Sequence, residues 1–328
     1  MGWIGKLLNG GDEKNKPAPV TAAAAPEATL QPATITEIDA MYYRWLAAAG
    51  SAQAPAETEQ KILDELARLV REPIAGAALV PRIPAIIPQL MRTLQDENMS
   101  AAKLSAQLAQ DVLLVAEVYR EANRPCYQSR YNASPSINNM EGAIMLLGQN
   151  GMRMLLARVA FRPIVSMQSG GLTVRTAPLI WRQSEKCALA ASLVAPTMHA
   201  NAFDAYLAGL MANVGLVVAF RLIDQLHAPD AFPQSDAFIA QVFVQARLLS
   251  VRIAELWEFP ESVTRAIGHA AADADADPQA QALALGERLS KLRMLVDTGR
   301  FPADDPFVTA GLGRNELQVF DKLADEEE

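Results

Sequence analysis

The sequence contains few of the residues that build metal and redox sites. Of its 328 residues three are histidines, His199, His227 and His269, and two are cysteines. A site with several imidazole ligands would need nearly all of these histidines, which excludes most multi-histidine metalloenzymes. Cys126 and Cys187 lie 61 positions apart without a CxxC spacing. This usage is typical of a reducing compartment and does not predict a catalytic thiol.

The sequence also has fewer basic than acidic residues and lacks long apolar runs. Lys and Arg number 29 against 37 Asp and Glu, a formal net charge of −8. Because phosphate backbones are bound by a basic face, nucleic acid is not an expected partner. No run reaches the ~18 unbroken apolar residues that a membrane span requires. The nearest, 207–220, is interrupted by Asn213 and Gly215 and is expected as a buried core helix. No secretory signal is recognised, and we expect a cytoplasmic protein.

Strand signals are nearly absent, whereas helical periodicity recurs along the chain. Hydrophobic residues make up 51% of the sequence, enough for a sizeable core. Short β-branched alternation occurs only around 172–174, and the sequence therefore predicts an all-α architecture of about a dozen helices. The expected helices are 41–49 (after a start signal at Thr36), 57–70, 85–94, one following Ser100, 140–147, 152–159, 176–194, 205–226, 238–257, 263–271, 279–297 and 315–324. A loop is expected at 124–136, and no fixed-period repeat indicates a solenoid.

Several segments, in a fixed order, resemble the HDOD family, a branch of the HD-domain superfamily without its usual chemistry. These segments are 79–84 (LVPRIP), the pair Gln110–Asp111, 118–127 (VYREANRPCY), Ile137 with 143–148 (AIMLLG), 179–184 (LIWRQS), 205–215 (AYLAGLMANVG), 256–260 (LWEFP) and 266–269 (AIGH). The resemblance implies an HD-like helical fold in which an N-terminal helical subdomain packs on a degenerate HD subdomain.

The resemblance also implies a division of the chain. Residues 76–300 form the HDOD domain, with an N-terminal helical half at 76–170 and a degenerate HD half at 171–300. The segment 36–75 is a helical extension, and 301–328 is a C-terminal helix with a solvated acidic tail. Prolines predict a flexible tail and linker over 1–35. Within it, the apolar cluster in 1–10 is expected either as a frayed terminus or as a weak contact with a membrane surface or partner.

HD phosphohydrolases hold divalent metal through a histidine, an adjacent His-Asp pair and a late aspartate. By resemblance these positions carry Gln183, the pair Ala212 and Asn213, and Glu287, while His269 falls where the superfamily often has a histidine. Neutral amides and one carboxylate are a poor metal set. The expected site therefore has no metal ligand, no catalytic residue and no cofactor. Gln183 and Asn213 are expected to hydrogen-bond each other or a ligand.

Two further features have alternative interpretations. Gly148 and Gly151 bracket a predicted turn between helices, and because no strand precedes it, a phosphate loop is not supported. Arg153, Arg158 and Arg162 would form either a solvated face or a cationic stripe for an acidic partner.

The resemblance implies a function without catalysis. We expect a bacterial signal-transduction regulator, an interaction or output scaffold in two-component or cyclic-dinucleotide networks, whose partner is a response regulator or a cyclic-dinucleotide enzyme. The partner would bind helical surfaces, including a groove between 79–148 and 177–295. The alternatives are a degenerate metal-dependent phosphohydrolase, a sensor of a small ligand or nucleotide at the remnant pocket, and a membrane-proximal adaptor anchored by residues 1–10.

Overall fold

The computed structural model describes residues 32–48, 52–73, 79–81, 112–123, 137, 139–166, 171–227, 231–270 and 277–325. These belong to one compact unit that starts at Pro32. Residues 1–31 of the expected tail, the helices 85–94 and following Ser100 before residue 112, the loop 124–136 and Cys126 lie outside the described residues. The expected flexible linker is wrong at its end, because Ala33 is buried, Thr34 caps the first helix and Ile35 begins it. The predicted domain limits near 75 and 170 also fall in such segments and stay predictions.

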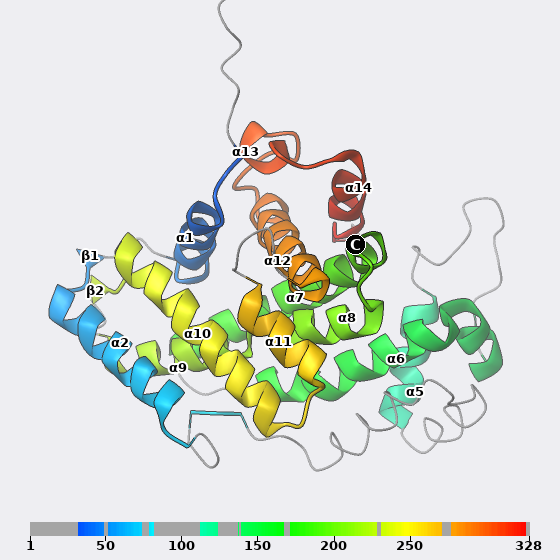
Figure 1. The fold of residues 1–328 in the computed structure, drawn as a ribbon, viewed down its shortest axis with the longest axis horizontal. Coiled ribbons are helices and arrows are strands. Elements are labelled where there is room, and N and C mark those ends of the chain that lie inside the picture. The colour runs from blue at the N-terminus through cyan, green and yellow to red at the C-terminus, as the bar shows by residue number, and fades with distance from the viewer. Residues whose placement is uncertain are drawn as a thin grey trace, which may run out of the picture. The chain divides into compact units, whose positions relative to one another are not determined.

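The all-α class predicted from periodicity is confirmed (Figure 1). The helices are α1 (Ile35–Leu46), α2 (Ala56–Arg71), α5 (Val112–Ala122), α6 (Met140–Ser166), α7 (Gly171–Val194), the 3₁₀ helix η2 (Ala195–Met198), α8 (Ala202–Met211), α9 (Val214–Leu226), α10 (Asp236–Leu256), α11 (Glu261–His269), α12 (Pro278–Asp297), α13 (Pro306–Thr309) and α14 (Arg314–Lys322). Strand structure in the described ranges is confined to β1 (Ala52–Gln53) and β2 (Ala231–Phe232), which pair in parallel.

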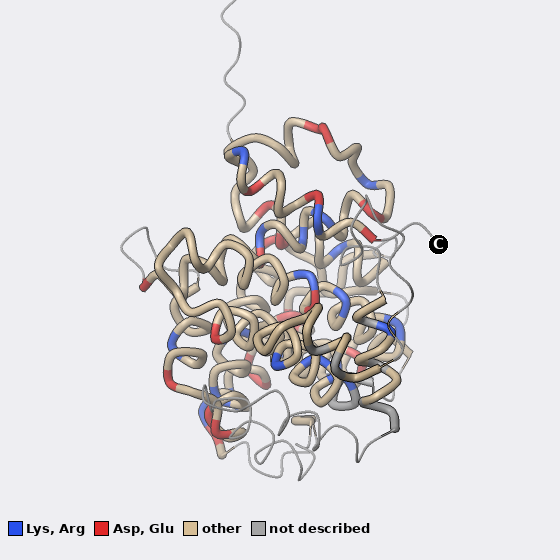
Figure 2. The backbone as a smooth tube through the Cα atoms, turned by 90° about the vertical axis from the view of Figure 1, so that its right-hand side faces the viewer, with Lys and Arg blue, Asp and Glu red and all other residues tan. Residues whose placement is uncertain are grey.

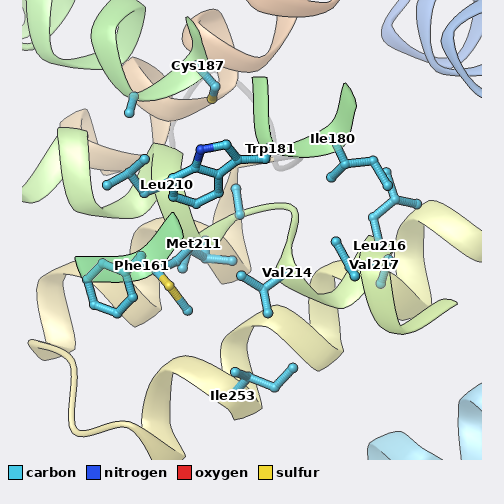
Figure 3. Packing of buried hydrophobic residues seen from close by; sticks show 14 of the residues in the cluster. Phe161, Ile180, Trp181, Cys187, Leu210, Met211, Val214, Leu216, Val217 and Ile253 are labelled. Atoms are coloured by element: carbon cyan, nitrogen blue, oxygen red, sulfur yellow. The ribbon is translucent and has the colours of Figure 1, made fainter. Parts of the chain in front are cut away.

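Helix α7 is the centre of the packing, with α8, α9 and α12 against it. Figure 3 shows the Trp181 indole of α7 beside Leu210 and Met211 of α8, within the main hydrophobic core. The backbones approach closely on two sides of α7. A Cβ atom on Gly209 would lie 2.5 Å from the Cα of Ala188, and one on Gly286 of α12 would lie 2.9 Å from the carbonyl oxygen of residue 187. Small residues therefore set the separation of these helices.

The expected single helix 205–226 is wrong, because the structure breaks it into α8 and α9 at Ala212 and Asn213. Ser250 of α10 satisfies backbone groups at the break. Its Oγ donates to the Ala212 carbonyl at 2.7 Å and accepts from the Gly215 N–H at 2.9 Å. A tertiary contact thus stabilises a break that a purely apolar pattern does not indicate.

Two described stretches, Ala202–Leu226 and Asp236–Leu256, are long and apolar enough to cross a membrane by composition alone. In the first, 94% of the most apolar window is buried inside the protein, as in the core helix of a globular domain. The expectation of a buried core segment at 207–220 is therefore confirmed, although two helices form it.

Helix α1 begins earlier than the predicted 41–49. Thr34 is its N-cap and forms a capping box with Glu37. The Glu37 N–H donates to Thr34 Oγ1 at 3.2 Å, and the Thr34 N–H donates to Glu37 Oε2 at 2.8 Å. The start signal lies two residues before Thr36, because the box needs its acidic residue three positions after the cap.

The short strand signal at 172–174 is wrong, since these residues form the first turn of α7. Asp224 of α9 caps that turn: its carboxylate accepts the N–H groups of Leu172 and Thr173 at 3.2 and 3.0 Å, and the Thr173 hydroxyl at 3.0 Å. Burial raises the pKa of Asp224, but these hydrogen bonds outweigh it and hold the pKa below its usual value. A carboxylate 51 positions from Thr173 thus stabilises a helix start in a segment with β-branched residues.

The other described helices lie close to their predicted ranges. The helices expected at 57–70, 176–194, 238–257, 263–271, 279–297 and 315–324 correspond to α2, α7, α10, α11, α12 and α14, with ends shifted by a few residues. Residues 140–147 and 152–159 both lie in α6, which is interrupted by non-helical backbone at Gly148.

Candidate functional site

The structure brings four of the five remnant positions to the buried contact between α7, the α8–α9 break and α12. Gln183 is fully buried, Asn213 and Glu287 are 5% and 3% exposed, and Ala212 is also buried. His269 is exposed at the C-terminal end of α11. The expected remnant therefore exists as a buried polar cluster, without its histidine.

The expected hydrogen bond between Gln183 and Asn213 is not formed. The Gln183 Nε2 donates instead to Ser290 Oγ of α12 at 2.8 Å, and Asn213 Nδ2 donates to Ser184 Oγ at 3.3 Å. Gln183 Oε1 has no hydrogen-bond partner among the described residues. Each amide is thus bound to a serine hydroxyl, which has both a donor and an acceptor to offer.

Glu287 is paired with an arginine from α10. Arg247 Nη2 donates to Glu287 Oε2 at 2.7 Å, and its Nη1 donates to the carbonyl of Ile267 at 3.2 Å. The two side chains are 16% and 4% exposed. Burial raises the pKa of Glu287, but the charges of Arg247 and Lys291 outweigh it and hold that pKa below its usual value. Burial lowers the pKa of Arg247, and Glu287 outweighs that in turn, so both partners are ionised.

A second buried pair adjoins the first. Lys291, one turn after Glu287 on α12, donates from Nζ to Asp39 Oδ1 of α1 at 2.6 Å, and its side chain is 1% exposed. The same Nζ lies 4.8 Å from the ring centroid of Phe243. Burial raises the pKa of Asp39 and exceeds the opposing effect of Lys291. The four groups Asp39, Lys291, Glu287 and Arg247, here called the charge quartet, carry no net charge when all are ionised.

The residues at this site do not fit a metal centre. A divalent ion needs imidazole, thiolate or carboxylate ligands with free lone pairs. Two amides, one methyl group and one carboxylate already bound to a guanidinium stand at the superfamily's ligand positions. In the described part of the chain, no three His, Cys, Asp or Glu side chains are grouped so that they could hold an ion.

The remaining histidines and the described cysteine have local structural roles or surface positions. His227 ends α9, and its Nδ1 lies 2.8 Å from the carbonyl oxygen of Ile223. His199 ends η2 in a left-handed conformation with φ of 59°. Cys187 is fully buried, and burial raises the pKa of its thiol well above the usual range. A buried neutral thiol is a poor nucleophile.

Asp325, the first residue of the acidic run 325–328 that was expected as a solvated tail, is exposed and also takes part in ion pairs. Asp325 pairs with Arg182 and accepts from Lys186 Nζ at 2.9 Å, while Lys186 also pairs with Asp297 at 3.0 Å. The buried Lys186 explains why this carboxylate is held, because an ammonium with little water contact needs a counter-charge. Residues 326–328 lie outside the described residues.

The arginines of α6 do not form one uniform stripe. Arg158 lies 3.8 Å from Glu185 of α7, Arg153 stacks on Phe203, and Arg162 is exposed. Figure 2 shows basic and acidic residues interspersed along the described chain.

Sequence reasoning did not identify three members of the charge quartet, Asp39, Arg247 and Lys291. Arg247 lies within the most regular apolar pattern of the chain. A charge among core positions needs a partner of opposite charge, so this position was the available signal of a buried ion pair. Lys291 follows Glu287 by four residues, a spacing that predicts an ordinary surface pair within one helix.

Comparison with known proteins agrees with this fold. The HDOD domain model matches residues 80–272. A protein from Shewanella amazonensis SB2B, named for a proposed metal-dependent phosphohydrolase activity, is 16% identical with a TM-score of 0.55 over 81% of this chain and 98% of its own. An HDOD domain protein of unknown function from Geobacter sulfurreducens is 20% identical with a TM-score of 0.54 over 82% and 94%.

A protein from Marinobacter aquaeolei VT8, named for a proposed role in signal transduction, is 20% identical with a TM-score of 0.53 over 81% of this chain and 63% of its own. No curated protein matches the sequence. At these identities the solved structures establish the fold alone. The family model spans more than half of the residues, and the chain therefore belongs to the HDOD domain family.

Proposed function

We propose that this protein is a non-catalytic bacterial signal-transduction regulator that acts as a cytoplasmic interaction scaffold in a two-component or cyclic-dinucleotide network. Membership of the HDOD family supports a signalling role, and the name of the Marinobacter neighbour is consistent with it. The expected partner is a response regulator or a cyclic-dinucleotide enzyme.

The observation that carries the absence of catalysis is the Arg247–Glu287 pair. A metal-dependent phosphohydrolase uses its carboxylate to hold an ion that polarises phosphate and lowers the pKa of water. Here the carboxylate is buried and bound to a guanidinium at 2.7 Å. Binding a cation at Glu287 would leave Arg247 buried without its counter-charge and beside a second positive charge, which is strongly unfavourable.

The full chain is expected to hold far less than one equivalent of transition metal and to leave bis(p-nitrophenyl) phosphate unhydrolysed with added Mn²⁺ or Mg²⁺. Elemental analysis and absorbance of p-nitrophenolate measure the two results. A combined variant, Gln183→His, Ala212→His, Asn213→Asp and Arg247→Met, restores donor types at the ligand positions and removes the competing cation. It is expected to bind more Mn²⁺ than the wild-type chain.

Stoichiometric metal in the wild-type protein that disappears in His269→Ala would contradict this proposal, and hydrolysis of the phosphodiester by the same protein would establish the phosphohydrolase alternative. His269 is the right residue to change for this purpose, since it is exposed at a helix end and its replacement leaves the buried cluster intact.

The scaffold role predicts a specific capture result. Met145 of α6 is 84% exposed, which is unusual for a large apolar side chain within the HDOD region. Affinity capture from the native cell is expected to recover a response regulator or a nucleotide-signalling protein with wild-type bait and several-fold less with Met145→Glu. Ile35→Glu is the matched control, because Ile35 is 41% exposed on α1, outside the family match. Equal recovery with all three baits would contradict docking at this surface.

A further inference from the structure

A surface cleft between α6 and the start of α8 is distinct from the remnant HD positions. It encloses about 250 Å³ and is lined by Gln149, Asn150, Arg153, Asn201, Ala202 and Phe203. We call it the α6–α8 cleft. None of the five remnant positions lines it.

The α6 side of the cleft is shaped by one glycine. Gly148 has φ of 66° and ψ of 176°, a region that residues with a Cβ atom rarely adopt. It ends the first part of α6 and starts a second helical segment at Gln149. Gln149 and Asn150 follow this kink directly, and both line the cleft.

The α8 side is held rigidly by reciprocal hydrogen bonds. Asn201 caps α8, its Oδ1 accepting the N–H groups of Phe203 and Asp204 at 2.9 and 3.0 Å. Its backbone N–H donates to Gln279 Oε1 at 3.0 Å, and Gln279 Nε2 donates to its carbonyl at 2.9 Å. Because the cap occupies Oδ1, Asn201 offers a ligand only the Nδ2 donors.

Arg153 supplies the charge of the cleft. Its guanidinium carbon lies 4.1 Å from the ring centroid of Phe203, a cation–π contact that fixes the side chain at the wall. A guanidinium has five N–H donors, so it is able to serve a ligand and a protein partner together.

The described lining residues include no carboxylate. The acidic residue next along α8, Asp204, accepts a hydrogen bond from Ser262 Oγ of α11 at 2.7 Å. A site with one arginine, three amides and a rigid wall favours an oxyanion that accepts several hydrogen bonds at once.

We propose that the α6–α8 cleft binds the phosphate group of a small phosphorylated ligand, a nucleoside phosphate ester. Whole ligand pockets usually measure ~300–1,000 Å³. At about 250 Å³ this cleft is below that range, a size that suits the phosphate and its sugar, so the base of a nucleoside ester would extend beyond it. The sequence pattern Gly148–Gly151 did not support a phosphate loop because no strand precedes it. In the structure the start of α8, whose N-cap Asn201 lies 50 positions after Gly151, forms the second wall of the cleft. This inference does not depend on the scaffold role.

Calorimetric titration of the full chain with inorganic phosphate and with adenosine 5′-monophosphate tests the proposal, at constant ionic strength set with chloride. Binding of the nucleotide is expected to be tighter than that of phosphate. Arg153→Gln is expected to weaken it by roughly tenfold or more, as for loss of a charge-assisted hydrogen bond.

Asn150→Asp keeps the size of an exposed side chain and adds one negative charge, so it should reduce affinity by a similar factor without disturbing packing. Arg162→Gln, an exposed arginine of the same helix that is not in the lining, is expected to bind as the wild type does. Absence of binding to the wild-type chain at millimolar probe, or equal affinity in all four proteins, would overturn the proposal. Tighter binding of phosphate than of the nucleotide would overturn the assignment to a nucleoside ester.

Discussion

Replacing Glu287 with leucine is expected to lower the free energy of unfolding by about 3–5 kcal/mol, because it leaves the guanidinium of Arg247 buried without its counter-charge. The Arg247 side chain is 16% exposed, and its Nη1 also donates to the carbonyl of Ile267. Such a loss is a large share of the ~5–15 kcal/mol by which domains are stable. Urea denaturation monitored by circular dichroism measures it.

The matched control is the double variant Arg247→Met and Glu287→Leu. Replacing both partners of a buried pair by apolar side chains is often neutral, so the double variant is expected to recover most of the stability lost by Glu287→Leu. If both variants lose the same free energy, the carboxylate acts through something other than Arg247. If Glu287→Leu unfolds at the wild-type urea concentration, the charge quartet is not a structural element.

Gly215→Ala is expected to destabilise the protein by about 3 kcal/mol or more, as overpacking against a rigid neighbour does. A Cβ atom at this first turn of α9 would lie 1.9 Å from the carbonyl oxygen of Ala246 and 2.9 Å from the backbone nitrogen of Ser250. Both atoms belong to the backbone of α10, so no side-chain rotation relieves the clash. Helices α9 and α10 would have to separate where Ser250 bridges the α8–α9 break.

Helix propensity alone predicts the opposite sign, since alanine exceeds glycine by ~0.5–1 kcal/mol within a helix. Gly268→Ala is therefore the control, because this exposed glycine of α11 would place its Cβ atom in ordinary contact, 3.6 Å from Val251 Cγ2. The Gly268→Ala variant should have a free energy of unfolding higher by ~0.5–1 kcal/mol. A gain at Gly215 as well would mean that α9 and α10 are farther apart than the structure shows.

Local patterns predicted most helices well and their interruptions poorly. Residues 238–257 were expected as one helix because their apolar residues recur every three or four positions, and α10 spans Asp236–Leu256. The same reasoning joined 205–226 into one helix. The break at Ala212 and Asn213 depends on Ser250, which lies 37 positions from Asn213 in the sequence. A sequence window cannot contain that hydrogen bond.

For the candidate site too, residue identities were predicted from the sequence, whereas their hydrogen-bond partners were not. The resemblance to the HD superfamily placed Gln183, Ala212, Asn213 and Glu287 at its ligand positions, and the types of these residues are enough to predict a poor set of metal ligands. Of the two expected partners of these amides, each other or a ligand, the first is not seen, because Gln183 donates to Ser290 of α12 and Asn213 donates to Ser184 of α7.

By itself, the sequence determined the all-α class, because helical periodicity is a local property, and its resemblance to the HDOD family indicated ligand positions that carry Gln183, Ala212, Asn213 and Glu287. Only the tertiary structure decided what neutralises the surviving carboxylate. Lys291 is one turn from Glu287, yet it binds Asp39, which lies 252 positions away, while Arg247 reaches Glu287 from another helix. Buried charges select partners by distance in the folded core, where low polarity makes an unpaired charge costly.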